Sequence, residues 1–354
     1  MSTWPAPARW VALVALSVLV SVIWSAAHLP AALLLGPLTG GIFFGVNGLH
    51  LSVPRWPYVA AQALIGALVA ASITPAIVAT LGHDSLLFGL VISATLLGAA
   101  GLGWLISRFG LIPGATAVYG TSPGAATAMV VLSEVQGADP RLVALMQYVR
   151  VLLVVLAAVL VAHFWAGTTA HARGLAWAAP VHWARLLEMI LLALVGQQLA
   201  RLLRVQAWAL LGPMLLLSAL HAAGWLPIEL PQWLLACAYA LIGWNIGLGF
   251  RREDLRHGRQ ALPVIVATAL GLIGFCGFLA WCLTWLTHVD PLTAYLATSP
   301  GGLDSVAVIA ASTPRVDLPF VLALQSVRLL FVIALAPLLT RLVVRYSPHL
   351  QRTA

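Results

Sequence analysis

Thr-Ser-Pro-Gly at residues 121–124 recurs unchanged at residues 298–301, and each copy interrupts a long apolar stretch of the chain. Proline removes a backbone donor and glycine has low helix propensity, so both copies predict a break in a helix. If these stretches lie in a membrane, lipid cannot satisfy the backbone groups that a break exposes. The repeated motif therefore predicts two segments whose backbone faces protein or a water-filled cavity.

The composition indicates the class of protein. Of the 354 residues, 62% are hydrophobic and 8% are charged, and the mean hydropathy is +1.00, whereas soluble domains carry about 25% charged residues. We therefore expect a polytopic membrane protein whose first partner is the lipid bilayer. The net charge of +8 comes from arginines, most of them in short loops. Such a bias is typical of cytoplasmic loops, so no nucleic-acid partner is expected.

Twelve apolar segments can be marked, each long enough to cross about 30 Å of hydrocarbon. The interval from His163 to Trp183 is the most polar one between long apolar runs, and we interpret it as a linker. The segments cover residues 10–28, 30–48, 57–80, 86–107, 110–134, 141–165, 185–203, 207–223, 233–250, 262–286, 290–311 and 319–343.

The two halves of the chain repeat in unbroken order and at nearly one offset, which indicates an internal duplication. The predicted domains are a first membrane repeat at 1–170, a linker at 171–184 and a second membrane repeat at 185–354. Besides the tetrapeptide, the matches are Leu-Gly-Pro at 35–37 and 211–213, Ala-Leu-Ile-Gly at 63–66 and 240–243, and Gln-Tyr-Val-Arg at 147–150 with Gln-Ser-Val-Arg at 325–328.

The loop arginines bear on the topology. If every segment crosses the membrane, they divide evenly between its two sides; if each Thr-Ser-Pro-Gly segment enters and returns on one side, thirteen lie inside and only Arg173, Arg185 and Arg315 lie outside. The second count obeys the positive-inside rule. It predicts an all-α membrane protein with two inverted repeats, about 10 crossing helices and two re-entrant or broken helices with Thr-Ser-Pro-Gly tips. A broken helix that crosses fully restores the even count and stays open as the alternative.

Inverted repeats with helices interrupted at matching positions are the means by which secondary transporters place a solute site at the midplane. The amides after each Pro-Gly carry the positive end of a helix dipole, which favours an anionic group. A Pro-kinked helix whose small residues serve close packing is the structural alternative. The candidate substrate-binding residues are Thr121, Ser122, Pro123, Gly124, Thr298, Ser299, Pro300, Gly301 and Gly302 at the tips, with Gln147, Arg150, Asn245, Gln325 and Arg328 from other segments.

Arg150 and Arg328 lie deep inside apolar segments, where a guanidinium costs about 2.5–3.5 kcal/mol and marks a functional group by default. Gln147 and Gln325 precede them by three residues, so each Gln–Arg pair shares a helix face. Two interpretations are open. Either the arginines bind a substrate carboxylate or phosphate, or they bond the carbonyls of the unwound segments and hold the scaffold together.

Asp304 follows Gly301 by three residues in the second copy, where the first half has Thr127. It is the candidate ion-coupling residue, with H+ or Na+ as the ion. An ion pair with Arg328 is its alternative role.

The sequence contains no motif typical of a metal site or a nucleotide-binding site. The ten histidines are scattered, and the three cysteines, Cys237, Cys276 and Cys282, lie in apolar segments without metal-ligand spacing. A phosphate-binding loop is absent as well. We expect no enzyme activity, no metal and no cofactor beyond a coupling ion.

The patterns Tyr-Gly-Thr-Ser-Pro-Gly-Ala-Ala and Ala-Thr-Ser-Pro-Gly-Gly-Leu-Asp, each followed by its Gln-x-Val-Arg, resemble the duplicated membrane domain of the bacterial AbrB family. The resemblance covers nearly the whole chain. It implies a bacterial inner-membrane protein with a fold like that of cation/proton antiporters. Members often carry an ammonia monooxygenase label, which the ligand count above does not support. The namesake is described as a regulator of gene expression, a role that transport would serve indirectly. Ala125 and Ala126 depart from the pattern of the second copy.

We therefore expect an alternating-access transporter of a small, anionic solute in the inner membrane, with both termini cytoplasmic. Proton- or sodium-coupled antiport through Asp304 is one alternative. A sensor or regulatory membrane protein without flux is another. The oligomeric state, a homodimer included, is left open.

Overall fold

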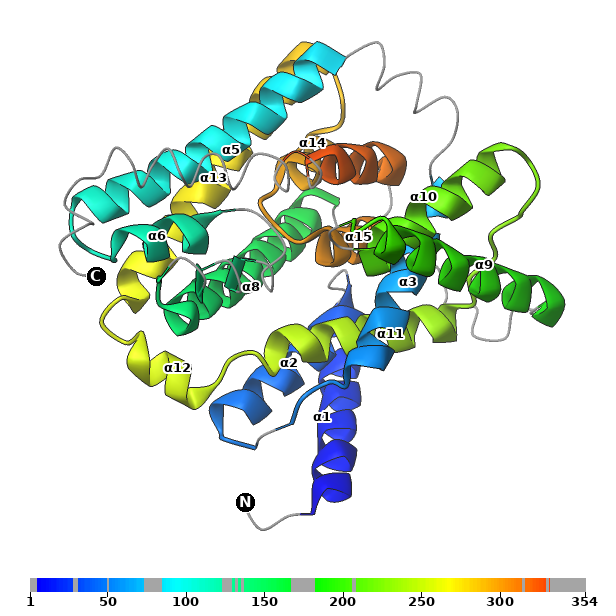
Figure 1. The fold of residues 1–354 in the computed structure, drawn as a ribbon, viewed down its shortest axis with the longest axis horizontal. Helices are drawn as coiled ribbons and strands as arrows, with labels where there is room; N and C mark the ends of the chain where they lie inside the picture. Colours follow the sequence, from blue (N-terminus) through cyan, green and yellow to red (C-terminus); the bar gives the residue numbers. More distant parts are fainter. Residues whose placement is uncertain are drawn as a thin grey trace. The chain divides into compact units, whose positions relative to one another are not determined.

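In the computed structural model, the regular secondary structure of the described residues is all helical, with no β-strand among them (Figure 1). Those residues are 5–27, 31–49, 51–72, 85–122, 129–130, 133–134, 137–166, 182–205, 208–313, 316–328 and 331. The all-α class expected from composition is confirmed for this part of the chain. The helices are α1 (Ala6–Ala26), α2 (Ala32–Val46), α3 (Arg55–Ser72), α5 (Ser85–Arg108), α6 (Gly114–Thr121), α8 (Pro140–Ala166), α9 (Trp183–Leu202), α10 (Trp208–Ala222), α11 (Gln232–Gly247), α12 (Arg252–His257), α13 (Leu262–Thr287), α14 (Pro291–Thr298) and α15 (Leu303–Ser312).

Six of the described helical segments are long and apolar enough to cross a membrane. Two segments expected to cross form shorter helices instead: α2 and α10 have 15 residues each, with Pro37 and Pro213 inside them. At 1.5 Å per residue such a helix rises about 22 Å, less than the hydrocarbon thickness. The matched pair is short in the same way. The six candidate spans are Ala6–Ala26, Phe88–Arg108, Pro140–Trp165, Trp183–Leu202, Gln232–His257 and Leu262–Thr287.

The chain forms two compact units, and each unit takes segments from both halves of the sequence. Helices of one half thus pack with counterparts from the other. Most of the predicted linker lies outside the described residues. Unit 1 comprises Met1–His83, Val161–Gly249 and Ala307–Ala323, and unit 2 comprises Asp84–Leu160, Phe250–Val306 and Leu324–Ala354.

Within unit 1, α2 packs against α11 and α3 packs against α10. In each of these contacts one helix comes from the first half of the sequence and the other from the second half. A Cβ atom on Gly66 of α3 would lie 2.6 Å from the carbonyl oxygen of Leu210 in α10, and one on Gly243 of α11 would lie 2.8 Å from the carbonyl oxygen of Leu34 in α2. Only glycine lets two helix backbones approach so closely. Gly66 and Gly243, which correspond in the two repeats, therefore each allow the same kind of close contact between helix backbones.

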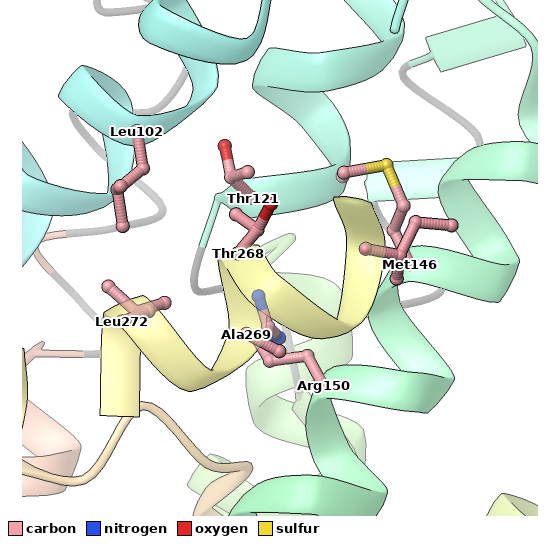
Figure 2. Close-up of a pocket in the computed structure, with 9 residues that line it drawn as sticks. Leu102, Thr121, Met146, Arg150, Thr268, Ala269 and Leu272 are labelled. Carbon is pink, nitrogen blue, oxygen red and sulfur yellow. The ribbon is translucent and has the colours of Figure 1, made fainter. Parts of the chain in front are cut away.

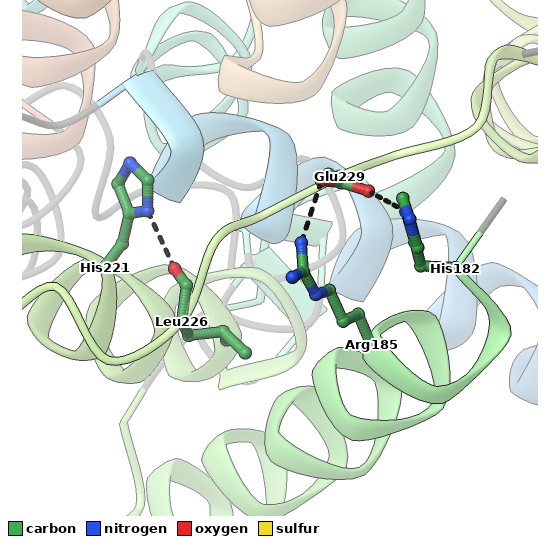
Figure 3. A network of polar contacts seen from close by, with 5 residues as sticks. All are labelled: His182, Arg185, His221, Leu226 and Glu229. Atoms are coloured by element: carbon green, nitrogen blue, oxygen red, sulfur yellow. Dashed lines mark hydrogen bonds and ion pairs between the residues drawn. The ribbon is translucent and has the colours of Figure 1, made fainter. Parts of the chain in front are cut away.

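The exposed surface of unit 1 carries a small polar network at the start of α9 (Figure 3). Glu229 accepts a hydrogen bond from Arg185 Nη1 at 3.3 Å and lies 3.1 Å from Nδ1 of His182. At least half of each side chain is exposed. Exposed ion pairs contribute about 0–1 kcal/mol to the free energy of unfolding. This network therefore connects the loop between α10 and α11 to α9 but adds little to the stability of the fold.

Unit 2 contains α5, α6, α12, α13, α14 and most of α8. Helices α5 and α13 lie side by side (Figure 1), with α6 packed on α5 and α14 packed on α13. Gly103 of α5 makes room for α6, because a Cβ atom there would lie 2.4 Å from Thr121 Oγ1. The short helices α6 and α14 are the ones that lead into the two Thr-Ser-Pro-Gly motifs.

Candidate functional site

Both short helices end at the threonine of the motif, at Thr121 and at Thr298. The serines that follow have extended backbones, with ψ of 121° at Ser122 and 137° at Ser299, because a residue before proline is disfavoured in the α region. In the second copy the helix resumes at Leu303. Pro123 and Gly124 lie outside the described residues.

The end of α6 is held by two side chains of α8, which together form the first carbonyl cap. Gln147 Nε2 donates to the carbonyls of Tyr119 and Ser122 at 2.8 and 3.2 Å, and Arg150 Nη1 donates to Ser122 at 2.8 Å. Both side chains are buried, with 0% and 4% exposure. A helix leaves its last four carbonyls without partners and presents a partial negative charge there, so an amide and a guanidinium suit the position.

The second carbonyl cap repeats this arrangement at the end of α14. Gln325 Nε2 donates to the carbonyls of Leu296 and Ser299 at 2.8 and 3.2 Å. Arg328 donates from Nη1 to Ser299 and from Nη2 to Gly301, the latter at 2.9 Å. Its Nη2 also donates to Oε1 of Gln325. Apart from the bond of Arg328 to Gln325, the observed hydrogen bonds of both arginines are thus with carbonyls of the interrupted segments.

The hydroxyls of the motifs also bond backbone carbonyls. Thr121 Oγ1 donates to Ala117 and Thr298 Oγ1 to Ala294, each at 2.9 Å, so the two threonines close the last turns of their helices in the same way. Thr298 has a second acceptor, the carbonyl of Cys276 in α13, at 3.1 Å. The serines donate to carbonyls within their own helices, Ser122 to Val118 and Ser299 to Leu296.

The second interruption packs against the helix that carries the first cap. A Cβ atom on Gly301 would lie 3.0 Å from Cγ1 of Val154, one turn beyond Arg150 on α8. Arg150 and Arg328 are both buried, with 4% and 6% exposure. Among the side chains that the structure describes, neither arginine forms an ion pair with a carboxylate. Unit 2 therefore gathers two buried positive charges in one region.

A small cavity opens beside the first cap (Figure 2), with room for about one water molecule. The guanidinium of Arg150 reaches from α8 towards the turn of α13 that carries Thr268 and Ala269. The Nε atom of Arg150 is buried and has no hydrogen-bond partner among the described residues. The lining residues are Leu102, Gly120, Thr121, Met146, Arg150, Ile265, Thr268, Ala269 and Leu272.

The remaining candidates lie around these groups or in the other unit. Pro300 is buried and Gly302 is partly exposed, both in the interruption before α15. Asp304 is in the first turn of α15, and its side chain falls outside the described set, as does its expected pairing with Arg328. Asn245 lies partly buried on α11, in unit 1. Sequence reasoning missed Thr268, which has no motif around it.

A third polar group lies at the start of α8, outside the apolar span. Asp139 accepts hydrogen bonds from the amides of Arg141 and Leu142 at 3.0 and 3.1 Å, the usual geometry of a helix N-cap. Its own amide donates to Thr116 Oγ1 of α6 at 3.1 Å, and its carboxylate lies 2.6 Å from Nε2 of His257 at the end of α12. This one residue thus connects three helices of unit 2.

These partners set the ionisation of Asp139. Partial burial by itself raises the pKa of the carboxyl, but the hydrogen bond and charge of His257 and the amides of Leu142 and Arg141 outweigh that effect. The pKa of Asp139 therefore lies below its ordinary value.

Metal ligands do not gather in the part of the chain that the structure describes: no three His, Cys, Asp or Glu side chains there are placed to hold an ion.

Comparison with known proteins gives consistent matches. The family model described as "Transition state regulatory protein AbrB" matches residues 33–344, a range that contains both caps. A protein of Escherichia coli (strain K12) named "Putative regulator AbrB" is 44% identical over 342 residues, which are 96% of this chain and 98% of that protein. A protein of Bacillus subtilis (strain 168) named "Uncharacterized protein YhjN" is 30% identical over 271 residues, 72% of this chain and 70% of that protein. Neither name describes an enzyme.

Proposed function

This chain belongs to the AbrB family, and we propose that it is a secondary, alternating-access transporter of a small anion. The observation that carries the proposal is the pair of carbonyl caps. The ends of α6 and α14, in one unit, are held at matched positions by matched Gln–Arg pairs, and helices interrupted in corresponding halves are the usual sign of a transport site.

The exchange of helices in unit 1 supports a two-fold relation between the repeats, since α2 with α11 corresponds to α10 with α3. Together with the loop arginines, this relation favours inverted repeats with about 10 crossing helices and two re-entrant segments. In this proposal the protein lies in the bacterial inner membrane with both termini in the cytoplasm.

The charge of unit 2 supports an anion as the solute. Arg150 and Arg328 are both buried, and among the described side chains neither forms an ion pair with a carboxylate. Buried charges are stable only when they are paired. A bound anion would supply the missing charge, with the motif residues 121–124 and 298–302 around it.

A second candidate is coupling to H+ or Na+ through Asp304. Its place favours this role, because it lies in the first turn of α15, directly beyond the carbonyl of Gly301 that Arg328 binds. An Asp304→Asn variant should then lose ion-dependent flux while it still binds the anion. The relative's name suggests regulation, and in this proposal a regulatory effect follows from the transported solute.

The direct test is flux in liposomes that contain the purified protein. Uptake of formate, acetate, propionate, sulfate and methylammonium is measured under an imposed proton or sodium gradient. Saturable uptake of at least one anion, above that of protein-free vesicles, is expected. If all four anions enter no faster than they enter protein-free vesicles under either gradient, the transporter proposal is wrong and a sensor without flux is favoured.

A further inference from the structure

The short helix α12 contacts α8 at both of its ends. Phe250, just before the helix, lies against Tyr148 of α8, with 6.0 Å between the ring centroids. Gly258, just after it, is buried, and a Cβ atom there would overlap Cδ2 of Leu145 in α8. The helix has six residues, and isolated helices of fewer than about 12 residues are marginal in water. Its position therefore depends on these two contacts and on the bond that His257 makes.

His257 connects α12 to two further helices through one residue, Asp139. Nε2 of His257 lies 2.6 Å from the carboxylate of Asp139, and the amide of Asp139 donates to Thr116 Oγ1 near the start of α6. Helix α6 is thus bonded to the chain of α8 at its start, through Asp139, and at its end, through the first carbonyl cap. A change in the contact between His257 and Asp139 therefore changes how firmly α12 is attached to the helix pair that carries this cap.

One partner of this contact changes its charge near neutral pH. Partial burial raises the pKa of Asp139, but the hydrogen bond and charge of His257 and the amides of Leu142 and Arg141 bring it below its ordinary value, so this carboxyl is ionised at pH 6 and at pH 8. Histidine changes its charge between pH 5 and pH 8, whereas arginine and surface carboxylates keep theirs between pH 6 and pH 8. The other charged residues of these segments are Glu134 and Arg141 around the start of α8, Arg251, Arg252, Glu253, Asp254 and Arg256 at α12, and Arg259 after it, while α6 has none.

The other histidine–carboxylate contact among the described residues differs in this respect. Glu229 lies 3.1 Å from His182 but also accepts a hydrogen bond from Arg185 (Figure 3). Arginine keeps its charge at any physiological pH, so Glu229 stays paired when His182 titrates. Among the ion pairs of the described residues, Asp139 has His257 as its one partner.

We propose that His257 and Asp139 form a pH-dependent latch, which holds α12 to the start of α6 and α8 when His257 is protonated and loosens when His257 is neutral. A hydrogen bond with a charged donor is roughly twice as strong as one with a neutral donor. The two side chains are 49% and 33% exposed, so solvent screens the pair and the attachment weakens by a modest factor without α12 being released. The first cap is then more firmly attached to α12 at pH 6 than at pH 8.

Cleavage after Arg259 by an arginine-specific protease measures the latch in the purified full-length protein, because Arg259 is exposed two residues beyond His257. Cleavage after Arg204, which is exposed in unit 1, is measured in the same sample and corrects for the pH dependence of the protease. The ratio of the two initial rates, Arg259 over Arg204, should rise at least threefold from pH 6 to pH 8. High salt should raise the ratio at pH 6 and leave it unchanged at pH 8, because salt screens a pair of charges.

Four variants assign the change to this pair. His257→Gln and Asp139→Asn each remove the charge of one partner and keep a hydrogen-bonding side chain, so the ratio should be the same at pH 6 and pH 8. His257→Lys keeps a positive charge at both pH values and should keep the ratio low at both; lysine adds no cleavage site for this protease. His182→Gln is the matched control and should retain the full pH dependence of the wild type.

The latch is overturned if the wild-type ratio is the same at pH 6 and pH 8, if the change persists in His257→Gln, or if His182→Gln also abolishes it. The measurement needs no transported solute, so it is separate from the proposed function. Absence of anion flux in liposomes would contradict transport and leave the latch standing. A ratio that does not depend on pH would contradict the latch and leave transport standing.

Discussion

Gln325 and Arg328 bind the same oxygen, the carbonyl of Ser299, and are also bonded to each other through Oε1 of the glutamine. The arginine is thereby fixed from two directions, by the helix end that it caps and by its neighbour one turn earlier. Its first-half counterpart lacks the bond within the pair, since Oε1 of Gln147 has no partner among the described residues. Among the described residues, the second cap thus has a hydrogen bond within its Gln–Arg pair that the first cap lacks.

Replacing Arg328 with Gln should destabilise the protein severely. The change leaves the carbonyls of Ser299 and Gly301 and the Oε1 of Gln325 short of a donor, and each buried acceptor without a partner costs about 1–3 kcal/mol. We expect a loss of several kcal/mol, measured by thermal unfolding in detergent. Arg328→Lys, which keeps a charged donor, should lose less. Equal melting temperatures for wild type and Arg328→Gln would contradict the cap.

The two glutamines should differ in the same sense. Gln325→Leu removes an amide that uses both its donor and its acceptor atoms, whereas Gln147→Leu removes one whose oxygen is already without a partner. We expect Gln325→Leu to cost about 1 kcal/mol more than Gln147→Leu. Chemical denaturation of the two variants side by side measures the difference. If Gln147→Leu were the more destabilising change, the number of hydrogen bonds would not determine which cap is more stable.

Gly243→Ala should strain the crossing of α11 with α2. The new methyl group would lie 2.8 Å from the carbonyl oxygen of Leu34, so the helices must separate, at about 1–3 kcal/mol. Gly66→Ala should behave alike at the matched crossing. Gly271→Ala is the control, because its methyl group would meet nothing within 4 Å. Melting temperatures that fall equally for all three variants would refute the close approach.

Asp139 predicts an acid-sensitive contribution to stability. Because its folded pKa is lowered, the stabilisation is fully present above the unfolded pKa of about 3.9 and is lost as the pH falls through the folded value. Asp139→Asn should therefore be less stable than wild type at pH 6, with the gap closing below about pH 4. Melting temperatures between pH 3 and pH 7 give the comparison. A gap that stays constant with pH would assign the effect to the helix cap rather than to the ionised carboxylate.

The features of this fold that sequence predicts are the local ones. The ends of α6 and α14 follow from a serine before a proline, and the Gln–Arg pairs are visible because three-residue spacing puts them on one helix face. The apolar composition indicates a membrane protein before any contact is known. Each of these inferences needs only neighbouring residues.

Contacts between distant segments had no such signal. The partner of Asp139 is His257, 118 residues away on a short helix between two long ones, and Thr268 belongs to the cavity only because α13 passes Arg150. The sequence left two roles open for the arginines. In the structure both arginines bind carbonyls, and Nε of Arg150 has no hydrogen-bond partner among the described residues. That difference depends on where the side chains lie in the fold, and two nearly identical sequence motifs do not predict it.

The exchanged crossings of unit 1 bear on how such a chain arose. Gly66 lies against α10 and Gly243 lies against α2. Each of these two glycines is therefore buried against a helix of the other half. A chain of one repeat's length could bury that glycine only against a second copy of itself. The two halves of this chain supply that pairing within one molecule, because each half buries the matched glycine of the other.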